Sequence, residues 1–159
     1  MTMVAKKIVP ARRLAAALAR RKARGERVVF TNGVFDLLHV GHVVLLEKAR
    51  ALGDCLVVGV NTDASVRRLK GRQRPLASLT DGRRVLASLE SVDYVTEFGE
   101  DTPQKLIQTL KPTILVKGGD YSLDQIVGRD LVARVVRVPL VKGRSTSALI
   151  KKILKAYGC

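Results

Sequence analysis

Aromatic residues and cysteines are scarce in this sequence. It has no tryptophan and only three phenylalanines and three tyrosines among 159 residues. Few aromatic side chains are available to stack on unpaired bases, and no zinc-finger spacing is present, so we expect no specific binding of nucleic acid. The two cysteines are Cys55, at the start of an apolar segment, and Cys159, the last residue. They do not form a disulfide framework of the secreted type, and we expect two free thiols.

Long apolar runs and acidic residues are also scarce. No run approaches the ~20 apolar residues that cross a bilayer. The short apolar segment 14–19 lacks a cleavage pattern, so we expect a cytoplasmic protein without a membrane anchor. The 29 Lys and Arg outnumber 14 acidic residues, which gives a net charge of +15 and an attraction to anions. An N-terminal extension, residues 1–25, is predicted to form an exposed basic helix with Arg12, Arg13, Arg20, Arg21, Lys22 and Arg24.

Apolar, β-branched segments alternate with segments of helical period through residues 26–159. The predicted strands are Val28–Thr31, Leu56–Val60, Tyr94–Phe98, Thr113–Val116 and Val135–Leu140. Helices are predicted at Val43–Leu52, at Val85–Leu89 with Thr80 or Asp81 as the cap, from Thr102-Pro103 to before Pro112, and after Ser147. This alternation indicates a single α/β domain with a doubly wound, Rossmann-like sheet of five parallel strands. Ligands of such a sheet bind beyond the carboxyl ends of the strands.

Both histidines follow the first predicted strand, at the end of the segment Thr31-Asn32-Gly33-Val34-Phe35-Asp36-Leu37-Leu38-His39-Val40-Gly41-His42. A spacing of three places both imidazoles on one face of a helix start, where they can donate hydrogen bonds to phosphate. Gly33 permits a tight turn, and Gly41 keeps side-chain bulk away from the space between the rings. Alternatively, Asp36, His39 and His42 could supply a carboxylate and two nitrogens to a metal ion.

Three further segments carry candidate ligand groups. In Val116–Tyr121, Lys117 offers charge and Asp120 can accept from a ribose hydroxyl, although a plain turn is the alternative. Gly143–Ser147 places three hydroxyls at a helix start, which suits either capping or binding of a polyphosphate. The basic loop Val66–Pro75 either closes over an anionic substrate or is solvated.

The element His39-Val40-Gly41-His42, together with the late Gly143-Arg144-Ser145-Thr146-Ser147, resembles the cytidylyltransferase-type nucleotidyltransferase superfamily and its HxGH motif. Within that superfamily, the sequence is most similar to the bacterial D-glycero-β-D-manno-heptose 1-phosphate adenylyltransferases. The resemblance runs from about Arg27 to Leu154 and includes residues 56–71, 100–103 and 115–121. It accounts for the histidines without a metal ion held by them.

The resemblance implies transfer of AMP from ATP to the anomeric phosphate of a heptose, giving ADP-heptose and pyrophosphate for lipopolysaccharide core synthesis. A sugar phosphate is already an anionic nucleophile, so this reaction needs alignment and charge stabilisation but no general base. The family also implies a Mg²⁺ ion on the phosphates, with unknown protein ligands, and a homo-oligomer. A separate sugar kinase would act upstream. The alternatives are a related cytidylyltransferase, for example of the glycerol 3-phosphate type, and a non-catalytic nucleotide- or nucleic-acid-binding module.

The resemblance also assigns roles to residues. His39, His42 and Lys70 are expected to act in catalysis, and the sugar phosphate is expected to contact Asn61, Asp63 and Lys70. The nucleotide and its phosphates are expected to contact Thr31, Asn32, Gly33, Phe35, Asp36, Gly41, Lys117, Gly118, Asp120, Gly143, Ser145 and Thr146. Two departures from the family stand out. Gly82 replaces an arginine, so Arg83 is assigned to the triphosphate provisionally, and Gly128–Arg134 is shorter than the family's segment.

Overall fold

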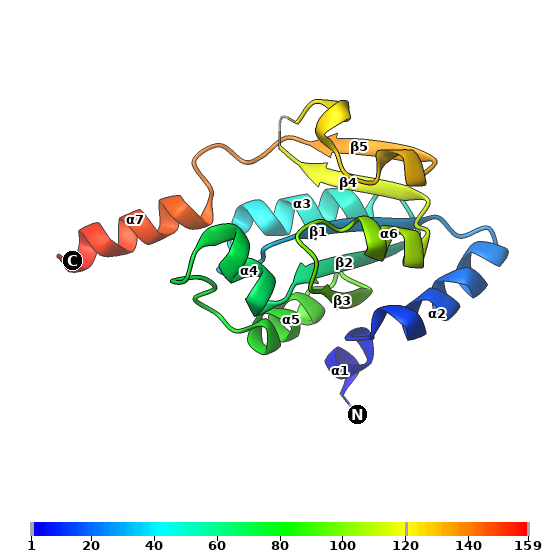
Figure 1. Cartoon of the computed structure of the whole chain (residues 1–159), viewed down its shortest axis with the longest axis horizontal. Helices are drawn as coiled ribbons and strands as arrows, with labels where there is room; N and C mark the ends of the chain where they lie inside the picture. The colour runs from blue at the N-terminus through cyan, green and yellow to red at the C-terminus, as the bar shows by residue number, and fades with distance from the viewer. Residues whose placement is uncertain (1, 120, 159) are drawn as a thin grey trace.

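The computed structural model describes residues 2–119 and 121–158 and contains a five-stranded sheet with helices on both faces (Figure 1). The strands are β1 Val28–Gly33, β2 Cys55–Asn61, β3 Tyr94–Phe98, β4 Ile114–Gly118 and β5 Arg134–Val138. All neighbours pair in parallel, in the order β3-β2-β1-β4-β5. The predicted doubly wound parallel sheet is confirmed, and each predicted strand end lies within two residues of the observed one.

Two hydrophobic layers sandwich the sheet. The helices are α1 Met3–Lys7, α2 Ala11–Ala23, α3 Val40–Arg50, α4 Asp63–Lys70, α5 Leu79–Ser88, α6 Gln104–Leu110 and α7 Thr146–Tyr157, with 3₁₀ turns η1 Leu123–Gln125 and η2 Arg129–Leu131. Alternate side chains of a strand enter opposite layers, so on β1 Val29 packs with α3 and α5, whereas Val28 and Phe30 pack with α2 and α6. The strands are therefore apolar on both faces, which explains their continuous apolar runs.

The N-terminal segment belongs to this core. Leu14 and Leu18 of α2 are fully buried in the same layer as α6, because they lie on one face of the helix at a spacing of four. The basic residues predicted to be exposed are exposed on the outer face, except for Arg21 and Lys22. Arg21 is half-buried and pairs with Glu26, and Lys22 donates to the Lys111 carbonyl at 2.7 Å.

Two helices begin three or more residues earlier than the sequence predicts. α3 begins at Val40, not at Val43, because His39 serves as its N-cap. α5 begins at Leu79, and its cap is Ser78, whose Oγ accepts from the Asp81 backbone N–H at 3.2 Å. The prediction of Thr80 or Asp81 as the cap is therefore wrong. Both earlier starts bring the helix N-termini closer to the carboxyl ends of the strands.

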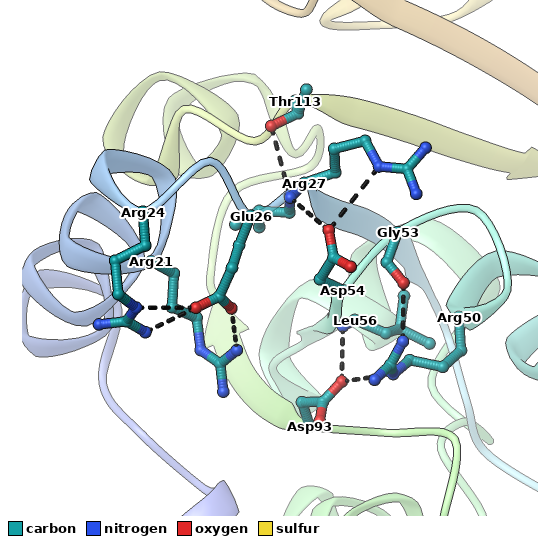
Figure 2. Close-up of polar contacts among 11 residues, drawn as sticks. Arg21, Arg24, Glu26, Arg27, Arg50, Gly53, Asp54, Leu56, Asp93 and Thr113 are labelled. Carbon is teal, nitrogen blue, oxygen red and sulfur yellow. Dashed lines mark hydrogen bonds and ion pairs between the residues drawn. The ribbon is translucent and has the colours of Figure 1, made fainter.

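The amino ends of the strands are joined by a polar network (Figure 2). Asp93, just before β3, accepts from the Leu56 backbone N–H at 2.8 Å and from Arg50 Nε at 2.9 Å. The Arg27 backbone N–H donates to Asp54 at 2.8 Å. Each contact joins the start of one strand to a neighbouring segment. The network therefore holds the amino ends of the strands in place.

The last helix, α7, extends from the body of the molecule, and none of its residues is buried (Figure 1). Within residues 2–119 and 121–158, none of the helices combines the length and apolar character needed to span a membrane. Cys55 is a buried free thiol, as predicted, and burial raises its pKa to about 12. The expectations for Cys159 and Asp120 lie outside the described residues.

Candidate nucleotide site

A cleft of about 550 Å³ opens at the carboxyl ends of β1, β2 and β4. The strand order reverses between β1 and β4, because β2 and β3 are added on one side of β1 and β4 and β5 on the other. Doubly wound sheets bind ligands at such a switch point, where the loops above adjacent strands diverge. Six of the predicted site residues line the cleft: Asn32, Gly33, Asn61, Lys70, Lys117 and Thr146.

Lys117 is the penultimate residue of β4 and lines the cleft. Its Nζ lies 5.6 Å from the centroid of the Tyr121 ring, and burial lowers its pKa. Among the described residues, no carboxylate forms an ion pair with this ammonium group. A partly desolvated cation facing an aromatic ring is a suitable place for an anion or for the polar part of a nucleoside.

The two histidines cap the start of α3. His39 Nδ1 accepts from the Gly41 backbone N–H at 3.1 Å, and His42 Nδ1 accepts from the His39 backbone N–H at 3.4 Å. The rings stack with their centroids 3.9 Å apart, and the Phe35 ring packs against His42 at 5.2 Å. This reciprocal capping fixes both imidazoles at a helix N-terminus, as their spacing predicts.

These hydrogen bonds also set where the imidazole protons lie. A ring nitrogen that accepts a hydrogen bond carries no proton, so the proton of each neutral ring lies on Nε2. Burial lowers the pKa of His39, and burial together with the charge of His39 lowers the pKa of His42 to about 4. At neutral pH each ring is therefore uncharged and has one Nε2–H group to donate.

The start of α7 lies beside the histidines. A Cβ on Gly41 would lie 3.2 Å from the backbone oxygen of Arg144, and Thr146 Oγ1 donates to the Leu37 carbonyl at 3.4 Å. Ser145 caps α7 by accepting from a first-turn N–H at 3.1 Å. The N-termini of α3 and α7 therefore lie close together, and the positive ends of both helix dipoles favour an anion between them.

Residues 66–70 of the predicted basic loop Val66–Pro75 are helical and end α4, and only the rest is a loop, which Asp36 fastens to the segment before His39. The Asp36 side chain is fully buried and pairs with Arg74, and it accepts from the backbone N–H groups of Leu76 and Ala77, both at 2.8 Å. Burial acts to raise the pKa of Asp36, but these hydrogen bonds lower it overall. Its oxygens are occupied by this loop and lie outside the main cleft, so Asp36 fits the predicted nucleotide contact poorly.

Asp63 and Arg83 also lie outside the main cleft. Asp63 accepts from the Leu79 backbone N–H at 2.9 Å and thereby holds the start of α5, and it borders a small neighbouring hollow with Gly82. Arg83 pairs with Glu97 of β3. The provisional assignment of Arg83 to the triphosphate does not fit this geometry, because its guanidinium already has a carboxylate partner.

The remaining predicted residues support the site from below or beside it. Thr31 is fully buried within β1, and its Oγ1 has no hydrogen-bond partner in the described part of the chain. A Cβ on Gly118 would lie 3.1 Å from the Leu45 side chain, so this glycine permits close packing of β4 against α3. Gly143 has a φ of +72°, which a left-handed turn before α7 requires and which favours glycine.

The positions of the histidine, cysteine and acidic side chains show whether the protein itself could bind a metal ion. The residues that the structure describes include no group of three or more histidine, cysteine or acidic side chains around one point. The alternative metal site at Asp36, His39 and His42 is therefore not assembled, since both Nδ1 atoms and the carboxylate face backbone donors. Mg²⁺ keeps several waters and binds readily to substrate phosphates, so a magnesium ion carried by a substrate would not need a cage of protein ligands here.

Some cleft residues were not predicted to be functional. They are Asp101, Thr102, Gln125 and Ile126, whereas Arg74 and Tyr121 lie in the candidate segments Val66–Pro75 and Val116–Tyr121. Asp101 and Thr102 follow the carboxyl end of β3, so the strand pattern marks them as candidates but does not tell whether they face a ligand. Gln125 and Ile126 lie at and after η1, a segment without a periodic pattern, and only the folded structure brings them over β4.

The fold and the site define a class, an α/β protein with a ligand cleft at the switch point of a parallel sheet. A family model described as cytidylyltransferase-like matches residues 30–156. The chain therefore belongs to the cytidylyltransferase-like family, and the family predicted from the HxGH motif is confirmed.

Several proteins of this kind are similar to the chain. Bifunctional protein HldE of Citrifermentans bemidjiense is 61% identical over 148 residues, which is 91% of this chain and 30% of that protein. HldE of Geobacter sulfurreducens is 59% identical, with the same coverage. The chain thus spans about 30% of the length of the curated relatives that it matches.

Two solved structures resemble the fold. The crystal structure of the lipopolysaccharide core biosynthesis protein from Thermoplasma volcanium is 28% identical, with a TM-score of 0.63, over 74% of this chain and 100% of that chain. Pantoate-beta-alanine ligase from Francisella tularensis, at 16% identity and a TM-score of 0.59, shows the fold alone over 93% of this chain and 78% of that one.

Proposed function

We propose that this chain transfers AMP from ATP to D-glycero-β-D-manno-heptose 1-phosphate, giving ADP-heptose and pyrophosphate for lipopolysaccharide core synthesis. The observation that carries the proposal is the pair of neutral imidazoles at the start of α3, beside the start of α7. Two fixed Nε2–H donors and two helix N-termini suit a polyphosphate whose charge is redistributed during transfer. The high identity to HldE proteins and the likeness to a lipopolysaccharide core biosynthesis protein support the choice of pathway.

In this proposal, a phosphate oxygen of the sugar 1-phosphate attacks the α-phosphorus of ATP. The bond from that phosphorus to the oxygen of the leaving pyrophosphate breaks. His39 and His42 donate to phosphate oxygens as negative charge develops on the leaving group. Lys70 binds the α-phosphate or the substrate phosphate, and the start of α7 with Ser145 and Thr146 binds the β- and γ-phosphates. The anionic acceptor needs no general base.

The proposal includes three further expectations. A Mg²⁺ ion that enters with ATP would neutralise part of the charge on its phosphates. The active form is a homo-oligomer, which sedimentation of the purified chain would test. The enzyme acts in the cytoplasm, where ATP is available.

Pyrophosphate release in the presence of Mg²⁺ and heptose 1-phosphate tests the proposal, with ATP, CTP, GTP and UTP offered in turn. We expect release with ATP alone, and none when the sugar phosphate is omitted. Release with CTP would make the chain a cytidylyltransferase. If no nucleotide gives release and the chain instead binds RNA or DNA with a steep salt dependence that His39→Ala leaves unchanged, the chain is a binding module.

A further inference from the structure

One carboxylate stands out in a cleft that otherwise offers cations. Among the described residues that line the cleft, Asp101 is the only acidic one, and it shares the cleft with Lys70 and Arg74. A negative charge at this place repels phosphate, so Asp101 weakens the binding of any ligand that is only a phosphate. Its presence is better explained by a ligand part that is uncharged and donates hydrogen bonds.

Arg68 of α4 holds this carboxylate in one orientation. Arg68 Nε and one terminal nitrogen both donate to the same oxygen, Asp101 Oδ1, at 3.0 and 2.8 Å, and that terminal nitrogen also donates to the Gly99 carbonyl. Asp101 Oδ2 has no partner in the described part of the chain. Asp101 is exposed to solvent and lines the cleft, so this second oxygen is available to a ligand.

The segment carrying Asp101 is also tied to the end of β2. Ser65 Oγ donates to the Glu100 carbonyl at 3.1 Å, and the amide of Asn61 donates to Ser65 Oγ at 3.0 Å. Asn61 and Thr102 line the cleft together with Asp101. One side of the cleft therefore offers a free carboxylate oxygen and a hydroxyl beside the ammonium group of Lys70, whereas Lys117 and Tyr121 come from the segments around β4.

We propose that Asp101 accepts hydrogen bonds from the sugar hydroxyls of the acceptor, and that Arg68 is the residue that positions it. This inference rests on the proposed function, because it names the part of the cleft that selects the acceptor. Lys70 binds the phosphate of the acceptor, and Asp101 makes the site favour polyhydroxylated sugar 1-phosphates over short phosphates. The carboxylate is suited to this task because it only accepts hydrogen bonds and sugar hydroxyls readily donate them.

Asp101→Asn tests the proposal through the split between acceptor and nucleotide kinetics. We expect the KM for heptose 1-phosphate to rise about tenfold or more, because a site built to bind hydroxyls loses an ionised acceptor. The KM for ATP stays unchanged. Inhibition by inorganic phosphate becomes stronger or stays the same, since a repelling charge is removed. Partial unfolding would not raise the KM for the sugar phosphate while leaving the KM for ATP and the inhibition by phosphate intact.

Three variants control for charge and position. Glu100→Gln removes the adjacent carboxylate, which pairs with Lys105 and does not line the cleft, and should leave both KM values unchanged. Arg68→Gln should raise the KM for the sugar phosphate in the same direction as Asp101→Asn. Arg68→Lys should partly restore it, because a lysine can still pair with Asp101 but fixes it less well.

Other kinetic outcomes in Asp101→Asn overturn the inference. A rise in the KM for ATP, or an increased requirement for Mg²⁺, would assign Asp101 to the nucleotide or its metal ion. Unchanged acceptor kinetics in Asp101→Asn would refute the inference and leave the proposed function standing. If the wild-type chain releases no pyrophosphate, calorimetric binding of glucose 1-phosphate and mannose 1-phosphate decides separately. Binding that weakens in Asp101→Asn then supports the subsite while the proposed function fails, and no binding refutes both.

Discussion

At the scale of single residues, His42 is the residue on which the proposed chemistry depends most. Its Nδ1 is engaged by the backbone, so Nε2–H is the only donor that the ring can offer a phosphate. His42→Ala should lower kcat by about 10²–10³, the usual loss for one preorganised donor. Unfolding should still be cooperative in that variant, because the core layers do not depend on the imidazole. Pyrophosphate release measures kcat, and thermal melting measures whether unfolding is cooperative. Near-wild-type turnover would contradict the role assigned to His42.

The lowered pKa of His42 also makes stability depend on pH. Its pKa is about 4 in the folded chain, below the ordinary value of 6.5, so the unfolded chain binds more protons between these values. The free energy of unfolding should therefore fall as pH falls from 6.5 towards 4. At pH 5 the loss from this group is about 1 kcal/mol once its partial exposure is allowed for. Denaturant unfolding at pH 7 and pH 5 tests this. Between pH 7 and pH 5, the free energy of unfolding should fall less in His42→Gln than in the wild type. An equal fall in both proteins would contradict the role of His42 in this pH dependence.

At the scale of elements, two glycines near the first turns of helices are expected to respond differently to the same substitution. In α3, a Cβ on Gly41 would lie 2.9 Å from His39 Cε1 and 3.2 Å from the Arg144 oxygen. In α5, a Cβ on Gly82 would meet only the Phe35 oxygen, at 3.4 Å. Gly41→Ala should therefore displace the His39 ring and lower kcat about tenfold or more. Gly82→Ala should raise the free energy of unfolding by about 0.5–1 kcal/mol without loss of activity. Equal kcat values in the two variants would contradict this.

The loop between α4 and α5 depends on Asp36. Asp36→Asn replaces a buried ionised acceptor that binds Arg74 and two backbone N–H groups, and the new amide group cannot accept all of them. Unfolding should become easier by about 3–5 kcal/mol. Trypsin should cut faster after Lys70 or Arg72, because the loop is released from the histidine segment. Asp81→Asn, at an exposed position of α5, is the control and should leave the trypsin pattern unchanged. An unchanged trypsin pattern in Asp36→Asn would mean that Asp36 does not hold the loop between α4 and α5.

At the scale of the whole molecule, the sheet could be predicted from the sequence because strands buried on both faces read as continuous apolar runs. The histidine turn could be predicted because glycine and histidine spacing is a local property. The carboxylates could not be assigned. Asp63 and Asp101 both follow strands of the same sheet, but Asp63 is taken by the Leu79 N–H, whereas Asp101 lines the cleft. Which of them faces a ligand depends on contacts between loops far apart in the sequence, and no local pattern records those. His39 was missed as a helix cap because caps are normally sought among short polar side chains.

The residues that stabilise the fold and the residues proposed to act on the substrate lie at opposite ends of the strands. The cleft occupies the edge formed by the strand carboxyl ends, while the network around Asp93 and Asp54 fixes the opposite edge (Figure 2). Asp93→Ala removes the acceptor for the Leu56 N–H and for Arg50, and should lower the free energy of unfolding by about 1–3 kcal/mol. Well below its melting temperature, this variant should keep the wild-type kcat and both KM values, since none of the described residues that line the cleft belongs to the network. Chemical denaturation and steady-state kinetics on the same preparation measure the two effects. A changed KM in the folded variant would mean that the network at the amino ends of the strands also controls the geometry of the cleft at their carboxyl ends.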